Sequence, residues 1–177
     1  MITLKAFERT PHLAELKVSY RRRETRRAKR GEPEETPFVV LDSMRCDLYL
    51  RQIWNKDTID LREEFIVICL NSAHQVLGWV NIASGGFSAT TVDPRIIFGI
   101  ALQTASAAIV IAHNHPSGSL TPSPQDIAVT QQLRAAGKML AITVLDHLII
   151  TRDSYFSFAD SEWTGKHLGA AANSTTT

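Results

Sequence analysis

From residue 37 onward, short apolar runs alternate along the chain with stretches in which apolar residues recur at helical spacing. Phe65 to Leu70 and Ala107 to Ala112 are almost wholly apolar, as expected of strands that are covered on both faces. Val76 to Ile82 and Ile142 to Thr151 are predicted to be two more strands. Tyr155 to Phe158 is predicted to pair behind the last of them.

Three helices are predicted between these strands. The first starts at Asp42 or Ser43 and ends around residues 54–56. The other two, Asp93 to about Thr104 and Ser123 to a stop at Gly137, each begin with a capping side chain followed by proline. The pattern therefore predicts the α/β class, with a mixed β-sheet flanked by helices.

Length and composition agree with one compact domain that carries short extensions. The chain has 177 residues, of which 44% are apolar, and a net charge of +1. We expect the domain to cover residues 37–163 and to follow an N-terminal edge strand and basic loop in residues 1–36. Residues 170–177 have too little apolar content to pack, and we expect residues 164–177 to be a disordered tail.

Neither a membrane span nor a secretion signal is evident. No apolar stretch approaches the roughly 18 residues that cross a bilayer, and Met1 to Lys5 lacks the build of a signal peptide. We therefore expect a cytoplasmic location and no membrane partner. Cys46 and Cys69 are far apart and lack Cys-x-x-Cys spacing, so we expect both to be reduced and buried.

A basic cluster lies within the N-terminal extension. Seven of the ten residues from Arg21 to Arg30 are Arg or Lys, and acidic residues follow at Glu32, Glu34 and Glu35. One interpretation is weak DNA contact through phosphates. The other is a solvated loop partly neutralised by its own acids. The low net charge and the lack of aromatic residues among the arginines favour the second.

A candidate metal site follows the strand that ends at Ala112. His113 and His115 are two residues apart on an extended segment, so their imidazoles point to the same side and can reach one ion. Asp126 can supply a carboxylate as the third ligand. Catalytic zinc commonly takes three such protein ligands and leaves a fourth position for water.

The same residues allow a purely structural interpretation. Ser123, Pro124 and Asp126 form a good helix start, with a serine cap, a first-position proline and an acid in the first turn. A helix that begins at Ser123 also holds Asp126 just past the loop that follows the histidines. Capping and metal binding are therefore compatible.

The run His113-Asn114-His115-Pro116-Ser117-Gly118, with ten residues between His115 and Asp126, resembles the JAMM motif of the MPN+ (JAB1/MPN/Mov34) metalloenzymes. Val144 to Ile150 and Ser157-Phe158 are further similar to the RadC-like branch. The resemblance covers about residues 37–160, and we expect no counterpart of the helix-hairpin-helix segment of longer RadC proteins. It implies the MPN fold, with a cytidine-deaminase-like arrangement of layers.

The resemblance also implies roles for the site residues. One zinc ion would be held by His113, His115 and Asp126. Glu63 corresponds to the upstream glutamate of the motif and is predicted to accept a proton from the activated water. Glu64 is the alternative base, since adjacent strand residues face opposite sides. Ser123 is predicted to donate a hydrogen bond to the developing oxyanion.

Two functions follow, of different classes. The first is a zinc-dependent hydrolase that cleaves peptide or isopeptide bonds of an unidentified protein or peptide substrate. The second is a DNA-associated accessory protein with a structural or vestigial metal. A complete set of ligands and base favours the enzyme. His147, in a predicted strand, is interpreted as a buried histidine behind the site, with substrate binding as the alternative.

Overall fold

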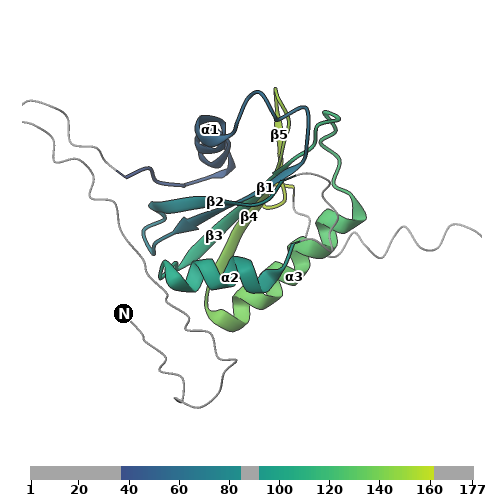
Figure 1. Ribbon diagram of the computed structural model, residues 1–177. Helices are drawn as coiled ribbons and strands as arrows, with labels where there is room; N and C mark the ends of the chain where they lie inside the picture. Colours follow the sequence, from purple (N-terminus) through teal and green to yellow (C-terminus); the bar gives the residue numbers. More distant parts are fainter. Residues whose placement is uncertain (1–36, 85–91, 162–177) are drawn as a thin grey trace, which may run out of the picture.

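The computed structural model of the protein describes residues 37–84 and 92–161 (Figure 1). One five-stranded sheet forms its centre, with the strand order β2-β1-β3-β4-β5. The strands are β1 (Glu64–Leu70), β2 (Val76–Ser84), β3 (Ala108–Asn114), β4 (Thr143–Ile150) and β5 (Tyr155–Ser157). The predicted edge strand, the Arg21 to Arg30 cluster and the C-terminal tail lie outside the described residues.

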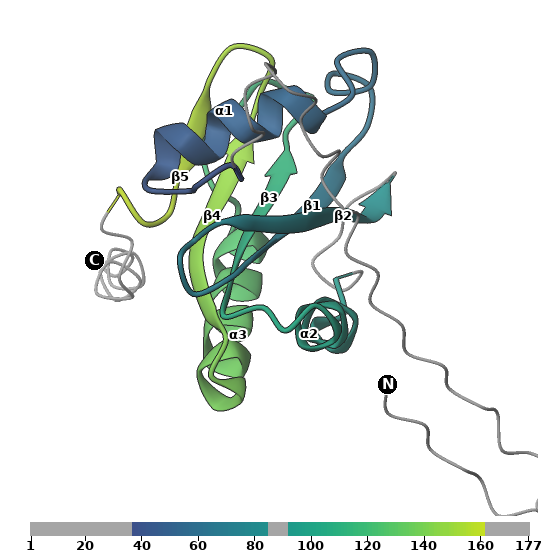
Figure 2. The same cartoon turned by 90° about the vertical axis from the view of Figure 1, so that its left-hand side faces the viewer.

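The sheet is mixed, as predicted. β1 pairs antiparallel with both β2 and β3, whereas β3 and β4 run parallel (Figure 2). β5 returns antiparallel beside β4. Because β3 and β4 are parallel, their carboxyl ends meet at one edge of the sheet, where the histidine segment begins.

Helices cover both faces of the sheet: α1 (Ser43–Ile53) lies on one face, and α2 (Pro94–Gln103) and α3 (Pro124–Leu140) lie on the other (Figures 1 and 2). Each helix begins where its capping signal predicted. The side chains of Asp42, Asp93 and Ser123 accept hydrogen bonds from backbone N–H groups in the first turns of α1, α2 and α3. The capping residues therefore set where each of the three helices begins.

The two faces of the sheet carry separate hydrophobic cores. On the α1 face, Leu50 and Trp54 pack against Ile66 and Ile68. On the face that α2 and α3 cover, the buried apolar residues include Phe65, Val67, Ile97, Ile111 and Leu133. Residues 64–70 and 108–114 are buried throughout, as expected of strands covered on both sides.

The predicted end of the third helix at Gly137 is wrong. α3 continues to Leu140, and Ala141 closes it in the left-handed conformation with φ 56°. Gly137 serves close packing instead, because a Cβ atom there would lie 2.4 Å from the carbonyl oxygen of Ile142. The glycine therefore marks where the chain turns back against the helix.

A bulge in β4 changes which side chains face α3. Ile109 pairs with Val144 and Val110 pairs with Asp146, so Leu145 is the extra residue. Val144 packs on the α3 face. Beyond the bulge, His147 faces the same side, where it contacts Thr130 of α3. Strict alternation from Val144 would have turned this imidazole toward α1.

Cys46 and Cys69 are buried free thiols, as predicted. Among the described residues, no helix is both long and apolar enough to cross a membrane.

Candidate metal centre

Three potential metal ligands converge at the carboxyl end of β3. His113 is the sixth residue of β3, His115 follows its end, and Asp126 lies in the first turn of α3. One ligand atom from each residue lies within 4.8 Å of the others. The side chains of His113 and Asp126 are almost fully buried, and that of His115 is 14% exposed. The cluster could hold one metal ion that is reached from the His115 side.

The distances suit a small divalent ion. The Nε2 atoms of His113 and His115 lie 3.0 Å apart, and Oδ1 of Asp126 lies 3.1 Å from Nε2 of His113. Two nitrogens bound tetrahedrally to zinc, each about 2.05 Å from it, are separated by about 3.3 Å. The donor set of two imidazoles and one carboxylate therefore fits zinc.

The loop after β3 orients His115. Its Nδ1 lies 2.8 Å from the carbonyl oxygen of Ser119, which can only accept, so Nδ1 donates there and Nε2 faces the cluster. Its backbone N–H donates to Ile150 of β4, and its carbonyl oxygen accepts from Gly118, whose φ of 77° favours glycine. The turn therefore aims Nε2 at the cluster.

Ser123 and Asp126 form a capping box. The Ser123 hydroxyl accepts from the Asp126 N–H at 3.1 Å, and the Ser123 N–H donates to Oδ2 of Asp126 at 2.7 Å. The cap fixes the carboxylate and uses only a lone pair of the serine oxygen. Helix capping therefore leaves the hydroxyl proton of Ser123 available to another acceptor.

Charge interactions within the cluster shift two pKa values. Burial alone would raise the pKa of Asp126, but its hydrogen bonds with His113 and His115 outweigh burial and hold it well below the ordinary value. The hydrogen bond to Asp126 raises the pKa of His115 against the opposing effect of burial. Ser119 and the negative charge of Glu63 raise it further. The carboxylate of Asp126 therefore stays ionised, as metal binding requires.

Glu63 and Glu64 have different surroundings. Glu64 is buried, and its Oε1 accepts hydrogen bonds from Arg62 at 2.9 Å and from Thr58 at 3.4 Å. Glu63 is half-buried, directly before β1, and close enough to act on the pKa of His115. Phe65 pairs with His113 across the sheet, and their rings stack. If the alternation of β1 is extended by one residue, Glu63 falls on the same face as Phe65.

Asn114 faces away from the cluster and holds the segment that leads to Glu63. Its amide nitrogen donates to the carbonyl oxygens of Ile59 at 2.6 Å and Arg62 at 2.8 Å, and its amide oxygen accepts from the Glu64 N–H at 2.7 Å. The segment that it holds is residues 59–64, far away in sequence.

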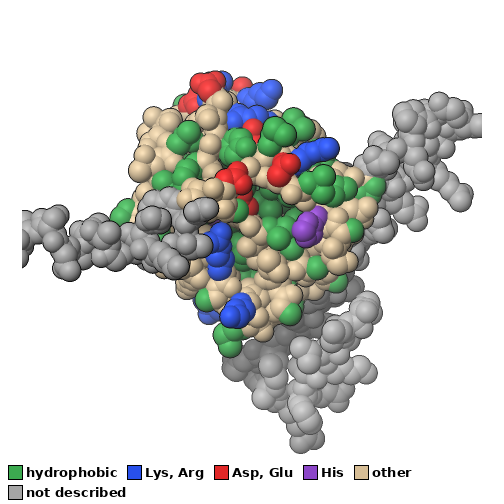
Figure 3. Space-filling view, turned by 180° about the vertical axis from the view of Figure 1, so that it is seen from behind, with side chains coloured by type: hydrophobic (Ala, Val, Ile, Leu, Met, Phe, Trp, Pro, Cys, Tyr) green, Lys and Arg blue, Asp and Glu red, His purple; other side chains and the backbone are tan. Residues whose placement is uncertain are grey.

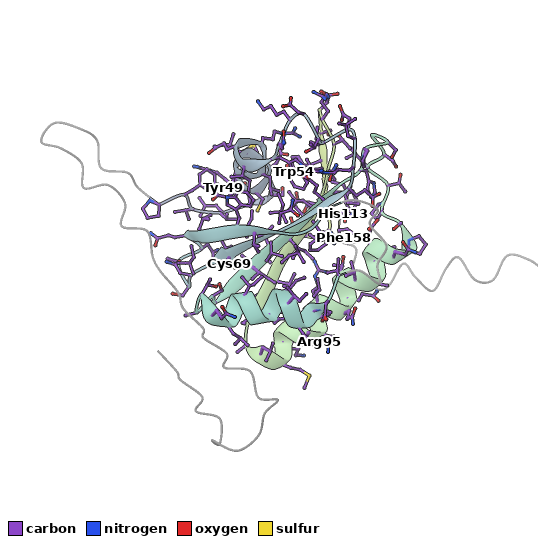
Figure 4. All side chains as sticks on the ribbon, in the orientation of Figure 1. Tyr49, Trp54, Cys69, Arg95, His113 and Phe158 are labelled. Atoms are coloured by element: carbon purple, nitrogen blue, oxygen red, sulfur yellow. The ribbon has the colours of Figure 1, made fainter. Side chains whose placement is uncertain are left out.

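Behind His113 lies His147, which is fully buried, as predicted for a histidine behind the site. Its Nε2 lies 2.8 Å from Nδ1 of His113, and its ring stacks on Phe158. Figure 4 labels these two neighbours, His113 and Phe158, beside the central sheet. Burial lowers the pKa of His147 well below the ordinary value. Thr130, which contacts His147, was not identified from the sequence, although it lies one helical turn beyond Asp126.

The structure thus brings His113, His115, Ser123 and Asp126 together and places Glu63 near His115. Their roles in binding and catalysis stay predictions.

Comparisons with known proteins agree with this geometry. The chain is 38% identical over 128 residues to a UPF0758 protein of Alkaliphilus metalliredigens, an alignment that covers 72% of this chain and 50% of the relative. A UPF0758 protein of Moorella thermoacetica is 42% identical over 118 residues, covering 67% of this chain and 46% of the relative. The chain therefore spans about half the length of these relatives.

A family model for the RadC-like JAB domain matches residues 41–163, which include every candidate site residue. The mixed sheet with its three helices is consistent with a JAB/MPN-type fold. The chain belongs to the RadC-like JAB domain family.

Proposed function

We propose that this protein is a zinc-dependent hydrolase of the JAMM type that cleaves amide bonds in peptides or isopeptide-linked proteins. The observation that carries the proposal is the convergence of two Nε2 atoms and one carboxylate within 4.8 Å, next to a half-buried glutamate. A metal bound only for structure needs no such acid beside it. Zinc at this position would supply the Lewis acidity that activates a water molecule and polarises the amide carbonyl.

Glu63 is the proposed proton acceptor. It is close enough to His115 to raise the pKa of that residue, whereas the Glu64 carboxylate is buried against Arg62 and Thr58. The Glu64 carboxylate is thus already engaged by two hydrogen-bond donors of the protein. Glu63 therefore takes the proton from the attacking water and can return it to the leaving amine.

Ser123 is the proposed oxyanion donor. Its oxygen accepts the Asp126 N–H, and its hydroxyl proton can point at the substrate carbonyl. Such a donor contributes about 3 kcal/mol to the transition state when it is held in place beforehand. The capping box provides that rigidity.

The test measures zinc and hydrolysis in matched variants. Protein purified without chelators is analysed for zinc and assayed against fluorogenic peptides and lysine-isopeptide conjugates. Glu63→Gln should keep one zinc per chain and lose hydrolysis of any substrate that the wild type cleaves, because the amide cannot accept a proton. Glu64→Gln is the control and should keep most of the activity.

Absence of zinc from the wild-type protein would contradict the proposal. Zinc loss in Glu63→Gln would make Glu63 a ligand, and loss of activity only in Glu64→Gln would move the base to that residue.

DNA contact through Arg21 to Arg30 stays a prediction, since these residues lie outside the described part of the chain. On the face drawn in Figure 3, the described Lys and Arg side chains are scattered among acidic and hydrophobic ones. We therefore expect weak, sequence-independent binding that vanishes near 0.15 M salt. Tight binding at that salt, lost on deleting residues 21–30, would make nucleic-acid binding the primary function.

A further inference from the structure

A chain of buried polar groups supports His113 from behind. Nδ1 of His113 lies 2.8 Å from Nε2 of His147, and Nδ1 of His147 lies 2.5 Å from the Thr130 hydroxyl. That hydroxyl in turn lies 2.5 Å from the backbone carbonyl oxygen of Asp126. All three side chains are buried. The chain therefore starts at one candidate ligand and ends on the backbone of another.

Only one direction of donation satisfies every link. A carbonyl oxygen can only accept, so the Thr130 hydroxyl gives its single hydrogen to Asp126. Nδ1 of His147 must then be an N–H group that donates to Thr130. A neutral imidazole has one N–H, which makes Nε2 of His147 an acceptor. Nδ1 of His113 therefore carries a proton and donates it. Its Nε2 lies 3.1 Å from Oδ1 of Asp126 and can share a second proton with that carboxylate, whose place a metal ion would take.

The surroundings of His147 favour its neutral form. Its ring is fully buried, stacks on Phe158 with centroids 4.9 Å apart and lies 6.0 Å from the Phe65 ring. A charge between these apolar rings would be costly. The bulge at Leu145 puts the imidazole in this position, so the arrangement is built into the sheet.

We infer that Thr130 and His147 are positioning residues that keep His113 protonated on Nδ1, so that its Nε2 is the atom presented for metal binding. The inference rests on the proposed function for its metal, but the tautomer of His113 can be measured in the protein without metal. Metal-binding histidines are commonly oriented through their second nitrogen by acceptors of this kind. Here the acceptor is another histidine, whose own tautomer is set by a threonine.

The inference gives Thr130 a distant effect. Without the hydroxyl, His147 can carry its proton on Nε2 and donate it to Nδ1 of His113. His113 would then hold its proton on Nε2, the nitrogen that must bind metal. After loss of the Thr130 hydroxyl, a proton on Nε2 of His113 would thus compete with the metal ion. This effect would arise although the described contacts of the Thr130 side chain are to His147 and to a backbone oxygen.

The first experiment compares Thr130→Val with Thr130→Ser in the full chain. Valine keeps the shape and removes the hydroxyl, whereas serine keeps the hydroxyl. Zinc affinity is measured by competition with a chromophoric chelator, and thermal stability is measured separately without metal. Thr130→Val should bind zinc about 10- to 100-fold more weakly, and Thr130→Ser should bind close to wild type. Wild-type zinc affinity in Thr130→Val would overturn the inference.

The second experiment reads the tautomers directly by ¹⁵N NMR of the imidazoles in metal-free protein. We expect Nδ1–H on both His113 and His147 in the wild type, and a shift of His147 toward Nε2–H in Thr130→Val. A purely structural role of Thr130 would leave the His147 tautomer unchanged. A His147 protonated on Nε2 in the wild type would overturn the inference.

These outcomes separate the inference from the proposed function. If the wild type takes up no zinc, the proposed function fails, and the NMR tautomers still decide the inference. If the wild type binds zinc and both Thr130 variants bind it equally well, the inference alone fails.

Discussion

Two neighbouring residues at the end of β3, His113 and Asn114, lie in surroundings of different kinds on the two faces of the sheet. His113 turns toward α3 and joins a cluster of ionisable side chains whose ligand atoms meet within 4.8 Å. Asn114 turns toward α1, where its amide makes three hydrogen bonds to backbone groups of residues 59–64. Both side chains are fully buried.

The two residues differ in which side-chain atoms remain available to bind a ligand. The Asn114 amide is committed to the backbone on both its nitrogen and its oxygen, so it stabilises a loop. The His113 and His115 rings each use Nδ1 for support and direct Nε2 at a common point with Asp126. Burial of a polar group therefore does not identify a site, whereas converging ligand atoms do.

The largest effect is expected on the His113 side. His113→Ala should reduce bound zinc from about one equivalent per chain to nearly none, because two ligands cannot hold the ion. The measurement is metal analysis of folded protein. His74→Asn is the control, since His74 lies in the β1–β2 turn with φ 56° and asparagine tolerates that conformation. Zinc near one equivalent in His113→Ala would refute the assignment.

Asn114→Ala tests the other side. The substitution leaves the carbonyl oxygens of Ile59 and Arg62 and the N–H of Glu64 without their partner. We expect a loss of about 3 kcal/mol in the free energy of unfolding, measured by urea denaturation, with zinc retained by the folded protein.

Asn71→Ala is the matched control for that measurement, because Asn71 also bonds through both amide atoms but is only partly buried. It should lose about 1 kcal/mol. Equal losses of unfolding free energy in the two variants would show that burial of the Asn114 amide does not increase its contribution to stability.

A smaller loss is expected far from the cluster, at Gly137. A Cβ atom there meets the Ile142 carbonyl oxygen at 2.4 Å, so Gly137→Ala should lower the free energy of unfolding by about 1–3 kcal/mol. Gly99→Ala in α2 is the control. Its Cβ would meet nothing within 4 Å, and we expect a gain of about 0.5–1 kcal/mol. Zinc content should stay the same in both, which separates destabilisation from loss of the site.

The smallest effect concerns Cys46 on the α1 face. Burial, with nearby carboxylates, raises the pKa of its thiol from 9.0 to about 12. The folded state thus holds this proton more tightly, so the associated stability is present below pH 9 and is lost as pH rises toward 12. At pH 8 the folded protein should resist thiol labelling until it is unfolded in urea. Rapid labelling of Cys46 in folded protein would contradict this burial.

Much of this arrangement could be predicted because its signals are local. The capping residues Asp42, Asp93 and Ser123 gave the starts of all three helices, and the apolar runs gave β1 and β3. The ligand spacing from His113 to Asp126 is equally local. The sequence alone therefore predicts that these side chains converge.

What could not be predicted depends on contacts between distant segments. Gly137 looks like a helix stop, but its packing against Ile142 is tertiary. The bulge at Leu145 follows from strand pairing, and it decides which side His147 faces. Thr130 is an ordinary helical threonine until that imidazole lies beside it. The hydrogen bonds that Arg62 and Thr58 donate to Glu64 are likewise contacts that the sequence does not show, and the proposal of Glu63 over Glu64 as the base rests on them.

The register that pairs Phe65 with His113 has a consequence for the order of assembly. The three candidate ligands lie within residues 113–126, so closing that loop costs little chain entropy. Glu63 joins them only when β1 has found β3, a contact between segments about fifty residues apart. During folding, the three candidate ligands can therefore meet early, and the proposed base reaches them only after the central strands have paired.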